Sequence, residues 1–243
     1  MSFLIFGIIY IVAIAFSLTK VAEKLYRKLN GVRELRTKEE KELLEPIFNE
    51  VYKEAKEVNK NLSNNIKLFI MDSTEVNAFA YGRETLCVNK GSIELLNSKC
   101  LYGLMAHEFG HFSSYDTIAL LTSVIGNITL TTFTKAILLI TRLMSKTMPS
   151  DDKAWALGIV NKVLIFIYKA IILLGDLILM PTSRKGEYRA DKFACSCGYG
   201  EELYMTLKEL DLLYKTSPEK FMEQLRSTHP PISRRLQKIE ENM

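Results

Sequence analysis

The stretch LYGLMAHEFGHFSSYD, residues 101–116, places two of the chain's three histidines four residues apart, with a glutamate directly after the first. On a helix, residues i and i+4 lie on one face, one turn apart. His107 and His111 would therefore present two imidazole nitrogens to one metal ion, at the distance of about 2.0–2.1 Å that zinc prefers. Glu108 is rotated by about 100° from His107, so it would reach a water at the metal without being a ligand. The pattern predicts a zinc site with a glutamate base.

A catalytic zinc needs a third protein ligand and an open fourth position. The extended zincin pattern requires Gly at position 114 and His at position 117, but the chain has Ser114 and Thr117, which excludes that pattern. The segment SRKGEYRADKFA, residues 183–194, supplies Glu187 and, one turn later, Asp191. The economical assignment makes Glu187 the third ligand and Asp191 the acceptor that orients a ligating imidazole.

Other interpretations of these residues remain open from spacing alone. Asp116 competes as a ligand or as the acceptor behind an imidazole, although it ranks below Glu187. The two histidines of HEFGH are also compatible with buried core histidines. Glu187 and Asp191 are equally compatible with an exposed charged helix face, and spacing alone would favour that interpretation.

The chain is 48% hydrophobic and 25% charged, and its apolar residues are concentrated in three blocks. The first, residues 3–18, carries no charge and runs into a basic flank. The positive-inside rule then predicts an N-terminal transmembrane anchor over residues 1–19, with the bulk of the chain in the cytoplasm. A cleaved signal peptide is the alternative, because residues 13–15 read Ala-Ile-Ala, but the basic region that should precede it is missing.

The second and third blocks, residues 117–143 and 155–180, are each long enough to cross a hydrocarbon core of about 30 Å as a helix. Both contain polar residues, and three charges in the third block recur at seven-residue spacing, on one stripe of a helix. We predict a hydrophobic helical hairpin over residues 117–181 that spans the membrane. The alternative is an amphipathic hairpin that lies on the bilayer or caps the soluble part.

The remaining segments are soluble in character. Residues 20–60 are predicted to be a charged helical region, and residues 66–89 a small antiparallel sheet of about three strands, from short β-favouring runs separated by turn residues. Residues 61–116 and 182–243 would together form the domain that carries the candidate site. The net charge of +4 comes without a basic run interleaved with aromatics, so nucleic acid is not an expected partner.

Four motifs occur in the order found in the HtpX and CAAX-prenyl-protease type of membrane zinc metalloprotease, which this chain resembles: NAFAYG at 77–82, HEFGH at 107–111, EYRAD at 187–191 and THPPISRRL at 228–236. The resemblance implies a mainly helical α+β fold. Its parts are a zincin-like domain with a small antiparallel sheet, an N-terminal membrane helix and an inserted hydrophobic hairpin. It also implies one Zn²⁺ per chain, held by His107, His111 and Glu187.

The resemblance assigns further residues to the site. Asn77 and Ala78 match positions beside an edge strand, where an extended substrate can add as one more strand. His229 and Arg235 match positions near the metal, where they would hold substrate or stabilise the oxyanion. The chain departs from HtpX in having one N-terminal apolar segment instead of a pair. It also has fewer apolar segments than the prenyl protease, which weakens any expectation of isoprenylated substrates.

The function implied is that of a multi-pass cell-membrane zinc endopeptidase whose catalytic domain faces the cytoplasm. Its partners would be the lipid bilayer and unfolded or membrane-associated proteins, in membrane protein quality control, with Glu108 as general base. A zinc-binding membrane scaffold of the same fold without turnover is the alternative. A different HExxH hydrolase, such as a deformylase, would need a cysteine ligand in its own motif, and neither Cys87 nor Cys100 lies in one.

Overall fold

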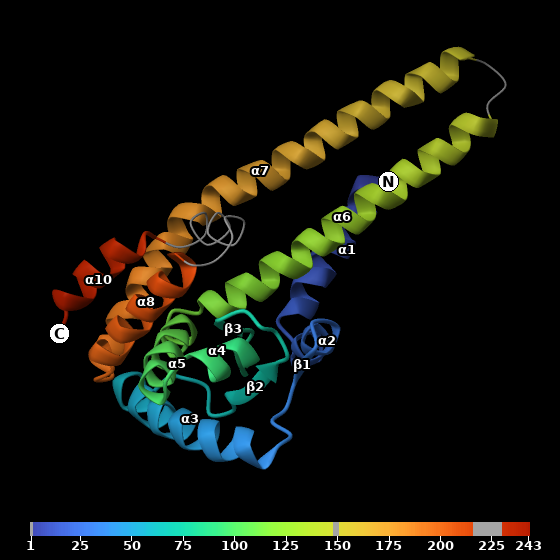
Figure 1. Cartoon of the computed structure of the whole chain (residues 1–243). Coiled ribbons are helices and arrows are strands. Elements are labelled where there is room, and N and C mark those ends of the chain that lie inside the picture. The colour runs from blue at the N-terminus through green and yellow to red at the C-terminus, as the bar shows by residue number, and fades with distance from the viewer. Residues whose placement is uncertain (1, 148–150, 216–229) are drawn as a thin grey trace. The chain divides into compact units, whose positions relative to one another are not determined.

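The computed structural model describes residues 2–147, 151–215 and 230–243, which form two compact units (Figure 1). The first unit combines Met1–Ser17 with Thr122–Pro181, and the second combines Leu18–Leu121 with Thr182–Met243. Where the structure describes it, the first unit consists of apolar helices, whereas the second contains the sheet and the HEFGH and EYRAD motifs.

Helix α1 (Ser2–Ser17) and most of α6 (Asp116–Thr147) and α7 (Asp151–Ser196) make up the first unit. Polar side chains join α6 to α7, since Thr131 Oγ1 lies 2.9 Å from the hydroxyl of Tyr168, and Thr141 donates to Asn161 Oδ1 at 2.6 Å. Among the described residues, one helix is long and apolar enough to cross a membrane, Asp116–Met144, with a mean hydropathy of 1.5. The other two predicted spans remain predictions.

The second unit contains a four-stranded sheet in the order β1-β2-β4-β3. Its strands are β1 (Val32–Arg33), β2 (Lys67–Met71), β3 (Ala78–Tyr81) and β4 (Thr85–Asn89). β3 and β4 form an antiparallel hairpin, but β4 runs parallel to β2, so the sheet is mixed and not antiparallel as predicted. β1 adds a fourth strand from within the region predicted to be helical. Strand β3 lies at one edge.

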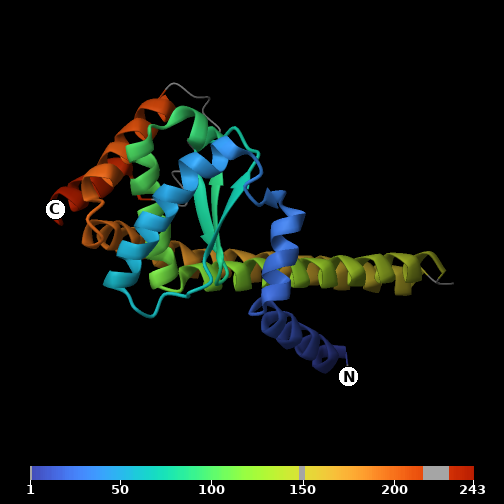
Figure 2. The same cartoon turned by 90° about the horizontal axis from the view of Figure 1, so that it is seen from below.

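Helix α5 (Ser98–Ser113) is the centre of the second unit, between helix α3 (Lys38–Val58), helix α8 (Gly200–Lys215) and strand β3 (Figure 2). Most of its residues are buried, because apolar side chains cover nearly all of its circumference. The described part of this unit also contains three shorter helices: α2 (Lys20–Leu29), α4 (Lys90–Leu95) and α10 (Ile232–Glu240). The HEFGH motif therefore sits on a helix that neighbours hold on several sides.

Arg33 joins strand β1 to helix α3 and to the end of β2. Its guanidinium donates to both carboxylate oxygens of Asp72, each at 2.7 Å, and to those of Glu40 at 2.7 and 3.1 Å. Glu40 also accepts from the backbone N–H of Thr37, in a capping box that begins α3. The hydrogen bonds from Arg33 lower the pKa of Glu40 to about 2.

Replacing Arg33 by Met should lower the free energy of unfolding at pH 7 by about 1–2 kcal/mol, because charged hydrogen bonds are lost at a mostly buried site. The folded-state pKa of Glu40 lies below its usual 4.5, so its contribution is present above that pH and is lost as the pH falls towards 2. Urea unfolding in detergent should therefore show the advantage of the wild type shrinking between pH 5 and pH 3.

The control is Lys38→Met, which removes an exposed ion pair with Glu42 on the same helix. It should change the free energy of unfolding by less than about 0.5 kcal/mol at any of these pH values. An advantage of the wild type over Arg33→Met that stays constant from pH 7 to pH 3 would contradict the assignment to Glu40 ionisation.

Candidate metal centre

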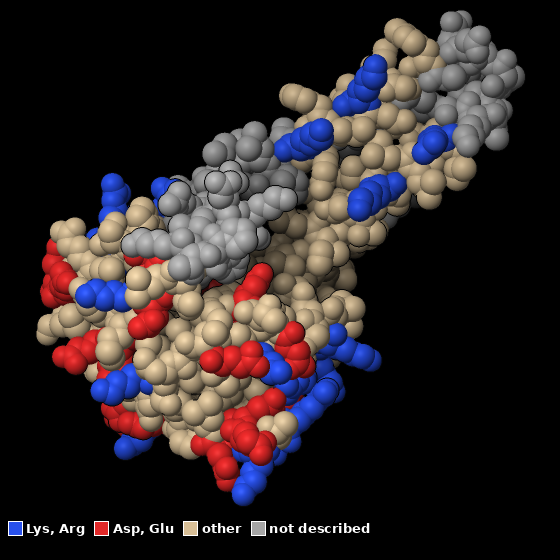
Figure 3. Space-filling view, viewed as in Figure 1, with Lys and Arg blue, Asp and Glu red and all other residues tan. Residues whose placement is uncertain are grey.

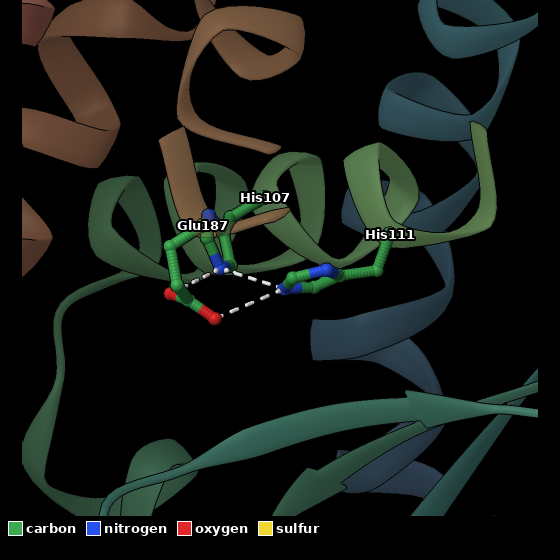
Figure 4. Close-up of side chains that lie close together, drawn as sticks. All are labelled: His107, His111 and Glu187. Atoms are coloured by element: carbon green, nitrogen blue, oxygen red, sulfur yellow. Dashed lines mark hydrogen bonds and ion pairs between the residues drawn. The ribbon is translucent and has the colours of Figure 1, made fainter. Parts of the chain in front are cut away.

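His107 and His111 lie one turn apart on α5 and turn their rings towards the same point (Figure 4). Their Nε2 atoms are 3.2 Å apart, and the two rings stand at 90° to each other. His107 is buried, whereas the side chain of His111 is 18% exposed. One imidazole is therefore shielded from water, and the other borders the open side of the site.

Glu187 reaches both imidazoles from helix α7. Its Oε2 lies 3.5 Å from Nε2 of His107, and its Oε1 lies 3.5 Å from Nε2 of His111 (Figure 4). The ligand atoms of these three residues all lie within 4.8 Å of one another. The structure thus brings together the two histidines and the glutamate that the sequence predicts as ligands.

A close contact between α5 and α7 makes this meeting possible. A Cβ atom added to Gly110 of HEFGH would lie 2.5 Å from the Cα of Ala190 of EYRAD. Only a glycine facing a small residue allows two helix backbones to approach so closely. Gly110 therefore allows the approach that brings Glu187 to the two histidines.

Asp191 and Arg235 lie behind His107, on the side away from its Nε2. Nδ1 of His107 is 2.9 Å from Oδ1 of Asp191, which matches the orienting role predicted for this carboxylate. Arg235, from α10, donates to both oxygens of Asp191 at 2.6 and 2.9 Å, and its Nη1 lies 3.2 Å from Oε2 of Glu187. Its guanidinium is thus engaged by two carboxylates, and the oxyanion or substrate role that the resemblance implies stays a prediction.

Asp116 has the corresponding position behind His111. Its Oδ2 lies 3.4 Å from Nδ1 of His111, and its Oδ1 accepts from Arg189 at 3.0 Å. From the sequence alone, Asp116 ranks below Glu187, and no motif singles out Arg189. The sequence signal that points to Asp116 is a carboxylate five residues after His111, at the start of the next helix.

Asp116→Asn should weaken zinc binding about 10–100-fold, because a neutral amide holds the His111 tautomer less firmly and makes the imidazole a poorer donor. Competition with a zinc-binding dye measures this. Glu201→Gln, at an exposed acid on α8, is the matched control and should leave the affinity unchanged. If Asp116→Asn binds zinc as tightly as the control, this carboxylate does not orient His111.

The charges around His107 oppose one another. Burial and the nearby Arg235 guanidinium lower the pKa of His107, but the carboxylates of Asp191 and Glu187 outweigh both and raise it to about 10. Burial also opposes ionisation of Asp191, yet Arg235 and His107 hold the pKa of this carboxyl below its usual value. The metal-free cluster therefore holds a proton that a metal ion must displace, so zinc binding should release it.

The donor set fits a zinc ion. Four ligands arranged tetrahedrally at about 2.0–2.1 Å from zinc lie roughly 3.3–3.5 Å from one another. The Nε2 atoms of His107 and His111 are 3.2 Å apart, and each lies 3.5 Å from one of the two carboxylate oxygens of Glu187. Two imidazoles with one carboxylate are a donor set of catalytic zinc sites. Three protein ligands leave the fourth position for water or substrate.

The other predicted site residues lie around this cluster or outside the described part of the chain. Glu108 is buried directly after His107, and its charge contributes to raising the pKa values of Cys87 and Arg235. Asn77 and Ala78 lie at the start of edge strand β3, which packs against α5. The backbone carbonyl of Asn77 accepts from Asn89 N–H at 3.0 Å. His229 lies outside the described residues.

Comparison with known proteins adds independent information. A family model described as peptidase family M48 matches residues 38–243. The chain is similar to the protease HtpX homolog of Tropheryma whipplei strain TW08/27, with 26% identity over 196 residues that cover 72% of this chain and 66% of the relative. The protease HtpX homolog of Dictyoglomus thermophilum is 30% identical over 193 residues, covering 71% of this chain and 62% of the relative.

The protease HtpX homolog of Bacillus subtilis strain 168 is 24% identical over 262 residues, covering 99% of this chain and 85% of the relative. For the Tropheryma and Dictyoglomus relatives, by contrast, the similarity covers slightly less than two thirds of their length. The matched region contains both motifs that supply the cluster in Figure 4.

Proposed function

Because this chain belongs to peptidase family M48, a family of metalloproteases, we propose that it is a membrane-anchored zinc endopeptidase. The observation that carries the proposal is the convergence of His107, His111 and Glu187 within 4.8 Å, with Glu108 beside them. The three converging residues would hold the metal. The chemistry that zinc supplies when bound at such a site is a lowered pKa of its water, to about 7, and polarisation of the scissile carbonyl.

Glu108 would act as the general base. Its carboxylate would take a proton from the attacking water and deliver it to the departing amine. Burial of Glu108 keeps bulk water from solvating this carboxylate, and its place next to His107 on α5 keeps it within one residue of a ligand. A rigid, buried helix is a suitable support for a base that must be held within hydrogen-bond reach of one water.

Asp191 and Asp116 would fix the two imidazoles. Each carboxylate lies at the Nδ1 atom of one histidine, at 2.9 Å for Asp191 and 3.4 Å for Asp116. A proton on Nδ1 would leave Nε2 with its lone pair directed at the metal. Arg235 would in turn hold Asp191 and neutralise part of the negative charge that the carboxylates gather around the site.

Strand β3 would receive the substrate. It lies at the edge of the sheet, so an extended peptide can add beside it through backbone hydrogen bonds. Asn77, whose side chain is exposed immediately before the strand, would contact that peptide, and Ala78 begins the paired segment. In this binding mode, alternate side chains of the peptide give specificity, and hydrogen bonds to the peptide backbone give affinity that does not depend on its sequence.

The membrane part of the proposal concerns topology. The apolar helix Asp116–Met144 is a candidate span, and α1 is a shorter apolar helix followed by basic residues. His107 and Glu187 share one site, so the chain between them crosses the bilayer an even number of times. We place the site in the cytoplasm of a multi-pass cell-membrane protein that acts on unfolded or membrane-associated proteins, in membrane protein quality control.

The test is zinc content together with cleavage of unfolded casein by the detergent-purified chain. We expect one zinc per chain, and cleavage that a chelator abolishes and added zinc restores. Glu187→Gln should lose both zinc and cleavage, whereas Glu201→Gln, at an exposed acid, should keep both. A chain that binds one zinc but never cleaves, even when its own chain is the substrate, is a zinc-binding scaffold and contradicts the proposal.

A further inference from the structure

Helix α2 (Lys20–Leu29) exposes an apolar stripe that begins just before the helix and follows one face of it. The stripe consists of four large apolar side chains at spacings of three and four residues. Their exposed fractions are 47% for Leu18, 67% for Val21, 46% for Leu25 and 74% for Leu29. Residues at such spacings lie on one face of a helix. This is an apolar surface without a described partner on an otherwise strongly charged helix.

A row of lysines runs along one border of this stripe. Lys20, Lys24 and Lys28 recur every four residues and are exposed. Figure 3 shows basic side chains at the edge of the second unit where Figure 1 labels α2. Lys20 also pairs with Glu84. Long lysine side chains beside an apolar stripe can keep their charged ends in a polar layer while their stems cover apolar surface.

The opposite face of α2 is fixed to the sheet. Glu23 is buried and accepts from the backbone N–H groups of Arg83 at 3.0 Å and Glu84 at 3.1 Å, in the turn between β3 and β4. Arg27 donates to Thr85 Oγ1 at 2.7 Å. Because these contacts set the rotation of α2 about its axis, the apolar stripe must point away from the sheet.

The position of α2 in the chain indicates what covers the stripe. Helix α1 is uncharged and apolar and ends at Ser17, and α2 begins three residues later. Two residues separate the helices, and the side chain of Thr19 caps α2 by accepting from Ala22 N–H at 3.2 Å. A short helix with an apolar face, a lysine border and an adjacent membrane helix has the composition of helices that lie in the membrane interface.

We propose that α2 is a second membrane contact, lying in the plane of the bilayer surface. Val21, Leu25 and Leu29 enter the boundary between headgroups and acyl chains, and the lysine row meets anionic headgroups. The lysine row beside the stripe, directly after an apolar helix, favours an anionic lipid surface over a protein partner or a second copy of this chain. Through Glu23, the same helix holds the β3–β4 turn at a fixed depth relative to the lipid surface.

What the position of α2 implies for the substrate rests on the proposed function. If β3 receives the peptide, then the segments presented to it are those that lie at the bilayer surface. The contact of α2 with lipid does not depend on catalysis. It can therefore be tested with a spectroscopic signal and without any substrate.

The experiment uses the full chain in proteoliposomes, with the single tryptophan removed by Trp155→Phe. Leu25→Trp places a probe on the stripe, and Leu212→Trp places one on α8, at a position that is also exposed. Vesicles contain phosphatidylcholine with bromines at several acyl depths, with or without 30% phosphatidylglycerol. We expect blue-shifted emission from Leu25→Trp, quenched most by the shallow bromines, and solvent-like, unquenched emission from Leu212→Trp.

The lysine row has its own prediction. In Lys24→Gln/Lys28→Gln the quenched fraction of the Leu25→Trp probe in vesicles with phosphatidylglycerol should fall towards the value found without it, because each lysine near an anionic surface favours the docked state about fivefold and one lysine of the row remains. An unchanged response to phosphatidylglycerol would overturn the role given to the lysines.

Three further outcomes bear on this inference and on the membrane anchoring proposed above. If the chain floats with vesicles after a carbonate wash but Leu25→Trp is unquenched, the inference about α2 fails and the anchoring stands. Blue-shifted but unquenched emission would show that protein covers the stripe, either another part of this chain or a second copy. A chain that does not float with the vesicles overturns both.

Discussion

Replacing Glu108 by Gln is expected to leave zinc bound and to reduce peptide cleavage by about 10²–10⁴-fold, the usual contribution of a positioned general base. Glutamine has nearly the shape of glutamate and can still hold a water by hydrogen bonds, but it cannot take its proton. The loss should appear in kcat on a quenched fluorescent peptide, whereas zinc stoichiometry should stay at one per chain. Both quantities are measured on the same detergent-purified sample.

The control for Glu108→Gln is Glu201→Gln, the same substitution at an exposed position, which should keep full activity. Because Glu108 is buried near Arg235, the thermal unfolding temperature of both variants should be compared with that of the wild type. Activity within tenfold of the wild type would place the base elsewhere. Loss of zinc together with activity would make Glu108 part of the metal site and not its base.

The residues of the candidate site are predictable from the sequence because they fall in pairs, each on one helix. His107 and His111 share α5, and Glu187 and Asp191 share α7, so the 3.6-residue period alone puts each pair on one face. What joins the two helices is Gly110, whose missing Cβ allows the contact with Ala190. The spacing does not reveal that contact, and so the choice of Glu187 rested on chemistry and on the resemblance.

The role of Asp116 could not be read from periodicity, because the chain changes direction before it. Tyr115 has a φ of 60°, the one positive φ at a non-glycine position among the described residues. Such a conformation is uncommon for a large side chain, and neighbouring structure must impose it. The resulting turn between α5 and α6 directs the Asp116 carboxylate back to His111.

The sheet was predicted in the right place but with the wrong pairing. Short β-favouring runs identify β2, β3 and β4, but they do not say which strands become neighbours. The parallel pairing of β2 with β4 and the addition of β1 depend on contacts between residues far apart in the chain. Arg33 stabilises β1 through Glu40 and Asp72, and this cluster has no sequence signature.

The second large effect is expected at Arg235. Replacing Arg235 by Met should lower the free energy of unfolding by about 3–5 kcal/mol, the cost of leaving a buried charge without its partner. The buried guanidinium lies between Asp191 and Glu187, so its loss removes a positive charge that faces both carboxylates. Because zinc adds positive charge beside Glu187, saturation with zinc should restore part of the lost stability. Thermal unfolding in detergent, with zinc and with a chelator, measures both effects.

Two further variants test whether the effect at Arg235 comes from its charge and its paired hydrogen bonds. Arg235→Lys keeps the charge but cannot donate to both oxygens of Asp191 in the same planar geometry, so it should fall between the wild type and Arg235→Met. Arg234→Met, at the exposed neighbouring position on α10, should stay within about 0.5 kcal/mol of the wild type. If Arg235→Met is as stable as Arg234→Met in the presence of chelator, then Arg235 is not required to balance these carboxylates or to hold Asp191 in place.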